Sequence, residues 1–199
     1  MKIVLSGSPH SGKTTTLLAL RDKGHKIISE SAIDLIETVN GLCGLGGSRE
    51  WRKTFNVAWQ DLVVARQLHL EAQFAQMFPG EDVIIDSTPF DCLAFTSANL
   101  LDPVKAIDQS GSKIFELCKT MHYDMVFSLD TILPFDPRPA TGRLQTLEDC
   151  QKIRACQMRV YSSHGMTPFV VPQMSVGARV QMIEDHIKLR KQDVTRGLP

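Results

Sequence analysis

The feature that most constrains the fold lies near the start of the chain, where a glycine-containing segment joins a short apolar run to a helical pattern. Residues Gly7 to Thr14 match the pattern G-x-x-x-x-G-K-[ST] at every fixed position. The run from Lys2 to Leu5 is rich in β-branched and apolar residues, and leucines recur at helical spacing after Lys13. The sequence therefore predicts a strand, a loop and a helix in that order.

This loop has the residues that a phosphate-binding site needs. Glycines let the backbone curl so that N–H groups point at a phosphate, which the positive end of the following helix also attracts. Lys13 is expected to bridge the outer phosphates, and the Thr14 hydroxyl is expected to ligate Mg²⁺. We therefore expect ATP and Mg²⁺ as cofactors, with the nucleotide held by the loop and the start of its helix: Gly7, Ser8, Pro9, His10, Ser11, Gly12, Lys13, Thr14 and Thr15.

The rest of the chain alternates between strand and helix patterns. Further strands are expected at 25–29, 82–85, 125–129 and 169–171, and helices at 31–39, 49–78, 91–122, 147–164 and 175–192. Breaks are expected in the 91–122 helix near Pro103 and Gly111, and a single break is left open for the 49–78 helix. This alternation predicts parallel βαβ units, and therefore an α/β fold with helices on both faces of a sheet. At 199 residues the chain is expected to form a single domain, 1–199.

Composition narrows the classes of function. The chain has 22 Lys plus Arg and 22 Asp plus Glu, so it lacks the basic excess of a protein that follows a nucleic-acid backbone. Its apolar runs are too short for a membrane span, and Met1 leads straight into a strand pattern, so we expect a soluble, cytoplasmic protein. The cysteines form no Cys-x-x-Cys pair and are expected to be reduced, mostly buried thiols: Cys43, Cys92, Cys118, Cys150 and Cys156.

Two carboxylates directly follow predicted strands. Asp86 ends the third strand, where a carboxylate can meet Mg²⁺ through water or accept a proton from the phosphoryl acceptor. The neighbouring Ser87 and Thr88 leave a helix-capping role open for this segment. Glu30 follows the second strand and is expected to face the acceptor, although a glutamate in the first turn of a helix also stabilises that helix.

A segment rich in prolines follows the fourth strand, from about residue 131 to residue 146. Its prolines and Gly142 exclude a regular helix, so we expect a long loop. We predict that this loop is a lid whose Arg138 and Arg143 neutralise charge on the transferring phosphoryl group. Arginines that face solvent are the alternative.

Two other patterns have ordinary explanations. Trp51, Phe55 and Trp59 recur at four-residue spacing, which favours core packing over base stacking. Arg154 and Arg159 follow the predicted lid, where pairing with Glu148 or Asp149 is as plausible as a contact with the nucleotide.

Several segments together carry a family resemblance: the phosphate loop and residues 28–32, 86–91, 161–165, 170–172 and 179–180. Over nearly its whole length the chain resembles the NadR-like, AAA-type P-loop family, which includes ribosylnicotinamide kinase domains. The resemblance implies a three-layer P-loop NTPase fold with a five-stranded parallel sheet in the order 2-3-1-4-5. It also matches Glu30 to the acid after the second strand, and Asp86 and Asp91 to the acids of an Asp-Arg-Gly-x-x-Asp pattern. Ser87 and Thr88 replace the Arg-Gly pair of that pattern.

These features predict an ATP-dependent kinase that acts with Mg²⁺ on a nucleoside, a ribosylnicotinamide-like compound or a nucleotide. Lys13, Glu30, Asp86, Arg138 and Arg143 are the expected catalytic residues, and Thr14 and Asp86 the residues at the metal. The alternative is a regulatory P-loop NTPase that hydrolyses slowly and acts through a protein partner. A Ras-type GTPase is not expected, because no Asn-Lys-x-Asp motif follows the fourth strand. Neither nucleic acid nor a membrane is expected as a partner, and a homodimer is left open.

Overall fold

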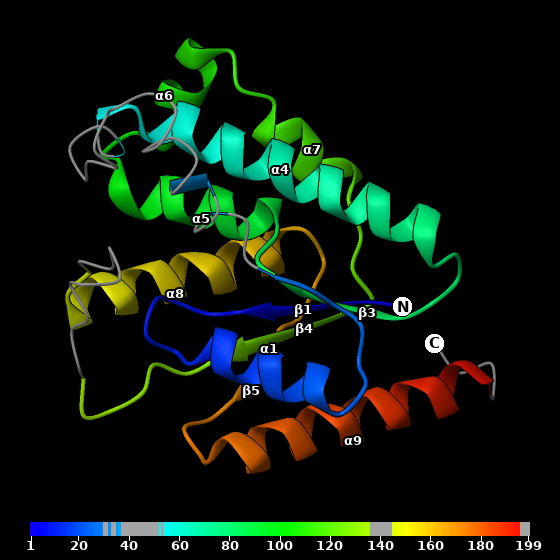
Figure 1. Ribbon diagram of the computed structural model, residues 1–199. Coiled ribbons are helices and arrows are strands. Elements are labelled where there is room, and N and C mark those ends of the chain that lie inside the picture. Colours follow the sequence, from blue (N-terminus) through cyan, green and yellow to red (C-terminus); the bar gives the residue numbers. More distant parts are fainter. Residues whose placement is uncertain (30–31, 33–34, 37–51, 53, 136–144, 196–199) are drawn as a thin grey trace.

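The computed structural model describes residues 1–29, 32, 35–36, 52, 54–135 and 145–195 (Figure 1). Five parallel strands form one sheet in the order β2-β3-β1-β4-β5. The strands are β1 (Lys2–Ser6), β2 (Ile27–Ile28), β3 (Val83–Asp86), β4 (Met125–Leu129) and β5 (Phe169–Val171). The expected strand order is confirmed. The second strand is shorter than expected, because at this edge of the sheet only Ile27 and Ile28 pair with β3.

Helices cover both faces of the sheet, as expected (Figure 1). On one face lie α4 (Asn56–Met77), α5 (Pro89–Asn99), α6 (Pro103–Ser110), α7 (Ile114–Thr120) and α8 (Leu147–Ser163). On the other face lie α1 (Lys13–Asp22) and α9 (Val176–Thr195). Each face of the sheet has its own cluster of buried hydrophobic side chains. Side chains alternate along β1, so Val4 belongs to the larger cluster, and Ile3 and Leu5 belong to the smaller cluster on the other face.

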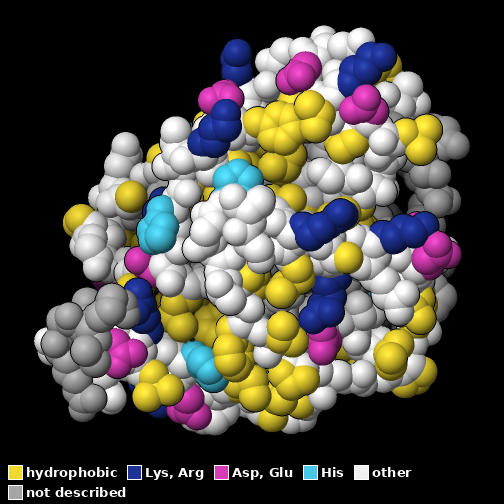
Figure 2. Space-filling view, turned by 180° about the vertical axis from the view of Figure 1, so that it is seen from behind, with side chains coloured by type: hydrophobic (Ala, Val, Ile, Leu, Met, Phe, Trp, Pro, Cys, Tyr) yellow, Lys and Arg dark blue, Asp and Glu magenta, His cyan; other side chains and the backbone are white. Residues whose placement is uncertain are grey.

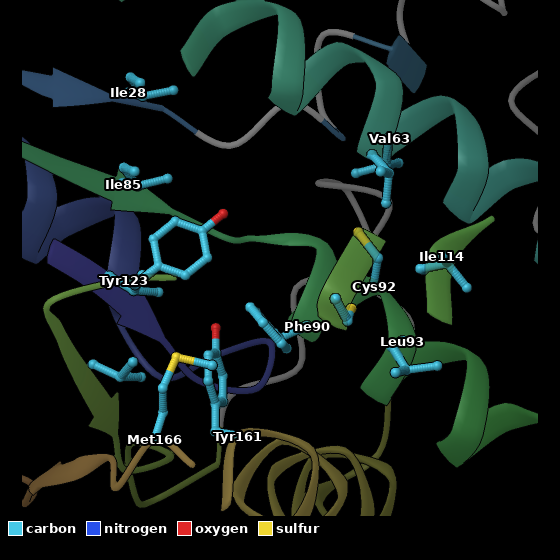
Figure 3. Close-up of a cluster of buried hydrophobic side chains, with 14 of the residues drawn as sticks. Ile28, Val63, Ile85, Phe90, Cys92, Leu93, Ile114, Tyr123, Tyr161 and Met166 are labelled. Carbon is cyan, nitrogen blue, oxygen red and sulfur yellow. The ribbon is translucent and has the colours of Figure 1, made fainter. Parts of the chain in front are cut away.

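The larger core is built around an aromatic side chain at the start of α5. Phe90 is fully buried, and its ring centroid lies 5.9 Å from that of Tyr123 and 5.3 Å from that of Tyr161 (Figure 3). Tyr161 comes from α8, so this cluster fixes α5 and α8 to each other above the sheet. The start of α5 directly follows Asp86, and its position therefore bears on the candidate site.

The helical region after β3 is divided where the sequence predicts. Asp102 accepts a hydrogen bond from the Lys105 amide (3.1 Å) and caps α6, whose first residue is Pro103. Gly111 ends α6 with a φ of 71°, a conformation that favours glycine. Instead of one helix with soft breaks, the segment therefore forms three separate helices.

The helix expected over 49–78 is broken once: Arg52 and Thr54 are helical, Phe55 lies in a turn, and α4 begins at Asn56. Phe55 precedes it and is 52% exposed, whereas Trp59 is buried against the larger core. Core packing thus explains Trp59 but not Phe55, and Trp51 lies outside the described residues. At the other end of the chain, Ser175 accepts a hydrogen bond from the Ala178 amide at the expected start of α9, which continues to Thr195.

The structure also tests what the sequence predicts for the cysteines and for a membrane span. The described cysteines, Cys92, Cys118, Cys150 and Cys156, are buried as expected and form no disulfide with one another, and Cys43 lies outside the described residues. Burial raises the pKa of the Cys118 thiol to about 12. Within the described ranges, no helix combines the length and apolarity that a bilayer span requires. Figure 2 shows Lys and Arg side chains interspersed with Asp and Glu over the face opposite to that of Figure 1.

Candidate functional site

The phosphate loop, residues Gly7 to Thr14, connects β1 to α1, and its two glycines are required by its shape. Gly7 has a φ of 152°, and a Cβ there would lie 2.8 Å from Ser11 Oγ and 2.9 Å from the Leu129 carbonyl oxygen. Gly12 has a φ of 78°, and a Cβ there would lie 2.9 Å from Ile132 Cδ1. Both the backbone conformation and the close neighbours therefore exclude larger side chains at these positions.

The N-terminus of α1 has the electrostatic character of an anion site. Among the residues that the structure describes, no side chain caps this helix, and its first turn contains no acidic residue. The Ser11 hydroxyl is buried beside the helix start and has no hydrogen-bond partner within the described part of the chain. A helix start with free N–H groups and a positive dipole end favours a bound phosphate.

Lys13 is folded back over the loop that it follows. Its ammonium donates to the carbonyl oxygens of Gly7 (2.7 Å) and Ser8 (3.5 Å), and the residue is only 8% exposed. The side chain is therefore buried within the phosphate loop itself. The loop itself supplies the acceptors that hold the charge, and the ammonium must leave them to reach a phosphate.

Neighbouring elements hold the phosphate loop from outside. Arg179, from α9, is 1% exposed and donates from Nη1 to the Ser11 carbonyl oxygen (2.5 Å). The Ile132 amide donates to the His10 carbonyl oxygen (3.2 Å). The Cys150 thiol, in the first turn of α8, donates to the Pro9 carbonyl oxygen (3.3 Å). The loop is therefore held by parts of the chain that are far apart in the sequence.

Asp86 is fully buried at the end of β3, in register with Leu5 of β1. Its position is therefore next to the strand that leads into the phosphate loop. Ser87 has a φ of 76° and turns the chain away from β3. Thr88 and Asp91 then form the capping box of α5. The capping role that was left open for this segment belongs to Thr88 and Asp91 and not to Asp86.

Asp91 is the centre of a buried hydrogen-bond network. Its Oδ1 accepts from Ser6 Oγ (2.5 Å) and Gln157 Nε2 (2.9 Å). Its Oδ2 accepts from the Thr88 amide (2.9 Å) and the Tyr161 hydroxyl (2.7 Å). Burial raises the pKa of the Asp91 carboxyl, while the bonds from Ser6 and Tyr161 oppose that rise. The network joins the end of β1 to α5 and α8.

The sequence-predicted site residues fall into two groups. The structure brings the phosphate loop and Asp86 to one edge of the sheet, and it places Thr14 half-buried and Thr15 exposed in the first turn of α1. Glu30, Arg138 and Arg143 lie outside the described residues. In the part of the predicted lid that is described, Thr131 Oγ1 lies 3.0 Å from Ser8 Oγ.

For three other residues at this edge, the structure shows contacts that the sequence did not predict. Gln157 was missed, although it lies at a position of α8 where an apolar residue would be expected, among Cys150, Ile153 and Tyr161. Arg179 lies in a segment that resembles the family, but the sequence predicted no role for it. Arg154 pairs with Asp130 (2.5 Å) rather than with Glu148 or Asp149.

The side chains fit a magnesium ion that takes part of its coordination from phosphate. Within the described ranges, no group of three or more His, Cys, Asp and Glu side chains could hold a metal ion alone. Mg²⁺ commonly keeps several waters and binds through one or two protein oxygens together with substrate phosphates. The hydroxyl of Thr14 and the carboxylate of Asp86 are oxygen donors of this kind.

Comparisons with known proteins concern the fold and the family of the chain. The deoxyadenosine kinase of M. mycoides with bound dATP is similar at a TM-score of 0.69 and 17% identity, over 94% of this chain and 100% of that one. Thymidylate kinase from Candida albicans has a TM-score of 0.63 at 16% identity, over 96% of this chain and 92% of that one. The NadR protein in complex with NR has a TM-score of 0.59 at 15% identity, over 86% of this chain and 43% of that one.

These structural likenesses show the fold, which is that of P-loop nucleoside and nucleotide kinases. No curated protein sequence matches the chain. A family model described as an AAA domain matches residues 2–179, which include the phosphate loop, Asp86 and Arg179. The chain therefore belongs to this family of P-loop AAA domains, as its resemblance implied.

Proposed function

We propose that this protein is an ATP-dependent phosphotransferase that acts with Mg²⁺ on a nucleoside, a ribosylnicotinamide-like compound or a nucleotide. The observation that carries the proposal is the phosphate loop, in which an uncapped helix start and the Lys13 ammonium lie together. The kinase fold of the structural neighbours supports the same class of reaction.

In this proposal the loop and Lys13 bind the triphosphate. The N–H groups at the start of α1 face the phosphates, and Lys13 moves from the Gly7 carbonyl oxygen to the outer phosphates. Bound Mg²⁺ would neutralise charge on the β- and γ-phosphate oxygens. Thr14 would ligate this ion through its hydroxyl, and Asp86 would hold it through water or accept the proton of the acceptor.

Three residues enter the proposal from the sequence alone. Glu30 would orient the hydroxyl of the acceptor, because the carboxyl edge of the second strand borders the cleft of such sheets. Arg138 and Arg143 would neutralise the charge that spreads over the phosphoryl group during transfer. We also propose that residues 1–199 form a single kinase-like domain, with a lid at about 131–146.

The direct test is an unbiased search for a phosphorylated product. The purified protein is incubated with ATP, Mg²⁺ and a pooled library of nucleosides, nucleotides and vitamin precursors, and mass spectrometry follows any compound that gains HPO₃. We expect at least one nucleoside-like compound to gain the group, with one ADP formed for each product. Lys13→Met is the negative control.

The other outcomes have separate meanings. ADP and inorganic phosphate without a phosphorylated acceptor would contradict the kinase proposal and favour a slow NTPase. A protein that binds no nucleotide would contradict both activities.

A further inference from the structure

The carbonyl oxygen of Gly7, the first residue of the phosphate loop, accepts hydrogen bonds from two side chains. One donor is Lys13 Nζ (2.7 Å) and the other is Gln157 Nε2 (3.3 Å). Lys13 is the residue expected to move to a phosphate, whereas Gln157 lies on α8 and is 1% exposed. After such a movement, the bond from Gln157 would remain.

The amide of Gln157 has its orientation fixed by its neighbours. Its Nε2 group lies between the Gly7 carbonyl oxygen (3.3 Å) and Asp91 Oδ1 (2.9 Å), which are both acceptors. Only the NH₂ side of an amide can satisfy two acceptors, and it has one hydrogen for each. The Gln157 side chain therefore bridges the phosphate loop to the buried Asp91 carboxylate.

The same amide leaves one of its own atoms unsatisfied. Gln157 Oε1 is buried and has no hydrogen-bond partner within the described residues. A buried carbonyl without a partner lowers stability, so the Gln157 amide occupies this position at a cost. This observation favours a role for the two N–H donors beyond the filling of space.

The carbonyl that Gln157 holds belongs to a glycine, whose backbone is not restricted by a side chain. Gly7 has a φ of 152° and no side chain, so its backbone has access to more conformations than that of any other residue type. If the Gly7–Ser8 peptide turned over, the Ser8 N–H would point in the opposite direction. Ser8 is completely buried within the loop, where such a reversal would change the lining of the site.

We infer that Gln157 is a positioning residue of the phosphate loop, which keeps the Gly7 carbonyl in place when Lys13 leaves it for a phosphate. The inference rests on the proposed function, because it requires that Lys13 binds a nucleotide. It adds to that function a residue on a distant helix whose own side chain need not touch the ligand. Asp91 fixes the other side of the amide and thereby links the loop to the capping box of α5.

The test compares two substitutions that each remove one hydrogen bond from Asp91. Gln157→Met removes the bonds to Asp91 and Gly7 and retains a side chain of similar length. Tyr161→Phe removes a bond to Asp91 (2.7 Å) and the contact with Thr88 Oγ1 (2.7 Å). It leaves the Gly7 carbonyl untouched, so it is the control for the loss of a donor to Asp91. Calorimetry measures the Kd of each protein for Mg²⁺ with a non-hydrolysable ATP analogue, and thermal unfolding measures stability.

We expect both variants to lower the Tm, because each leaves Asp91 with one donor fewer. Only Gln157→Met should weaken nucleotide binding, by about tenfold, which is the scale of one hydrogen bond. Tyr161→Phe should bind within about twofold of the wild type, since its effect is confined to stability. Equal losses of affinity in the two variants would overturn the inference by showing a merely structural effect.

The remaining outcomes separate this inference from the proposed function. Wild-type affinity in Gln157→Met would overturn the role of Gln157 and leave the proposed function intact. A wild-type protein that binds no nucleotide would overturn both. If Gln157→Met does not fold, hydrogen exchange of the wild-type Gln157 side-chain amide decides the question by NMR. Slow exchange both with and without the ATP analogue supports the inference, and faster exchange with the analogue overturns it.

Discussion

At the scale of single residues, the site depends on how a few polar groups are held where water is excluded. Lys13 is 8% exposed, yet its charge is accommodated because the carbonyl oxygens of Gly7 and Ser8 accept its hydrogen bonds. Asp86 is completely buried at the end of β3. These two residues lie at the same edge of the sheet, and we expect their substitutions to affect different parts of the proposed reaction.

Lys13→Met removes the ammonium and keeps most of the apolar stem. We expect turnover to fall by about a hundredfold or more, because in the proposed reaction this charge would stabilise the transferring phosphoryl group. Steady-state kinetics and calorimetry with an ATP analogue measure the effect. Lys119→Met, on the exposed surface of α7, is the matched control. Normal turnover of Lys13→Met in a folded protein would exclude the phosphate loop from the mechanism.

Asp86→Asn tests the proposed contact with the metal. We expect the Mg²⁺ concentration for half-maximal activity to rise by about tenfold or more, because residues that hold a metal through water commonly contribute on that scale. A Mg²⁺ titration of initial rates measures this shift, and Asp108→Asn, on exposed α6, serves as the control. An unchanged Mg²⁺ requirement with reduced turnover would favour the role of Asp86 as a proton acceptor.

At the scale of elements, α9 is held against the neighbouring parts of the chain at two places along its length. Near the start of α9, Arg179 contacts the phosphate loop. Further along, Glu184 accepts from Lys23 Nζ (2.6 Å) and lies 3.1 Å from His25 Nε2. The bond from Lys23 lowers the pKa of the Glu184 carboxyl, burial opposes this shift, and the contact with His25 adds to it.

The sign of this shift predicts a pH dependence of stability. Because the pKa of Glu184 is lower in the folded protein than its ordinary value of 4.5, its contribution is complete above that value. It is lost as the pH falls through the lower pKa of the folded state. We expect Glu184→Gln to reduce the free energy of unfolding by at most about 1 kcal/mol near neutral pH, since exposed ion pairs contribute little.

Chemical denaturation of both proteins between neutral and acidic pH measures the difference. The two stabilities should converge in acid. Glu148→Gln removes an ion pair with Lys152. Both of these residues lie in α8, so this variant is the control for an ion pair that does not connect two elements. A difference between wild type and Glu184→Gln that grows toward acid would contradict the assigned direction of the pKa shift.

At the scale of the whole molecule, the phosphate loop is in contact with several parts of the fold. It follows β1, leads into α1 and is contacted by Thr131, Cys150, Gln157 and Arg179. In Figure 1, the end of β1 and the starts of α1 and α8 lie on the same side of the molecule. Ligand binding at this place is therefore expected to stabilise the folded protein as a whole.

Saturation with Mg²⁺ and a non-hydrolysable ATP analogue should raise the Tm. At a ligand concentration one hundred times the Kd, the expected stabilisation is about 2.7 kcal/mol, or roughly 5–10 °C for a protein of this size. Differential scanning fluorimetry measures the shift. Lys13→Met should show a much smaller shift at the same ligand concentration. Equal shifts in both proteins would place the binding outside the phosphate loop.

Local sequence patterns were sufficient for much of the fold and for the phosphate loop. The motif from Gly7 to Thr14 predicts its own shape, because the glycines at positions 7 and 12 and a following helix are local requirements. The alternation of apolar strands and helices predicts the α/β class. The family resemblance added the strand order, which the sheet confirms. Periodicity did not locate the break at Phe55 that precedes α4, because the sequence has neither proline nor glycine there to mark it.

Only the tertiary structure decided which polar residues serve the loop and which serve the fold. In the sequence, Asp91 matched an acid of the family pattern. In the structure it caps α5 and accepts hydrogen bonds from Ser6, Gln157 and Tyr161. Gln157 and Arg179 reach the loop over 150 and 168 positions of the chain, respectively. A motif determines local backbone geometry through its own residues, whereas the partners of a buried polar group are set by which helices the sheet brings beside it.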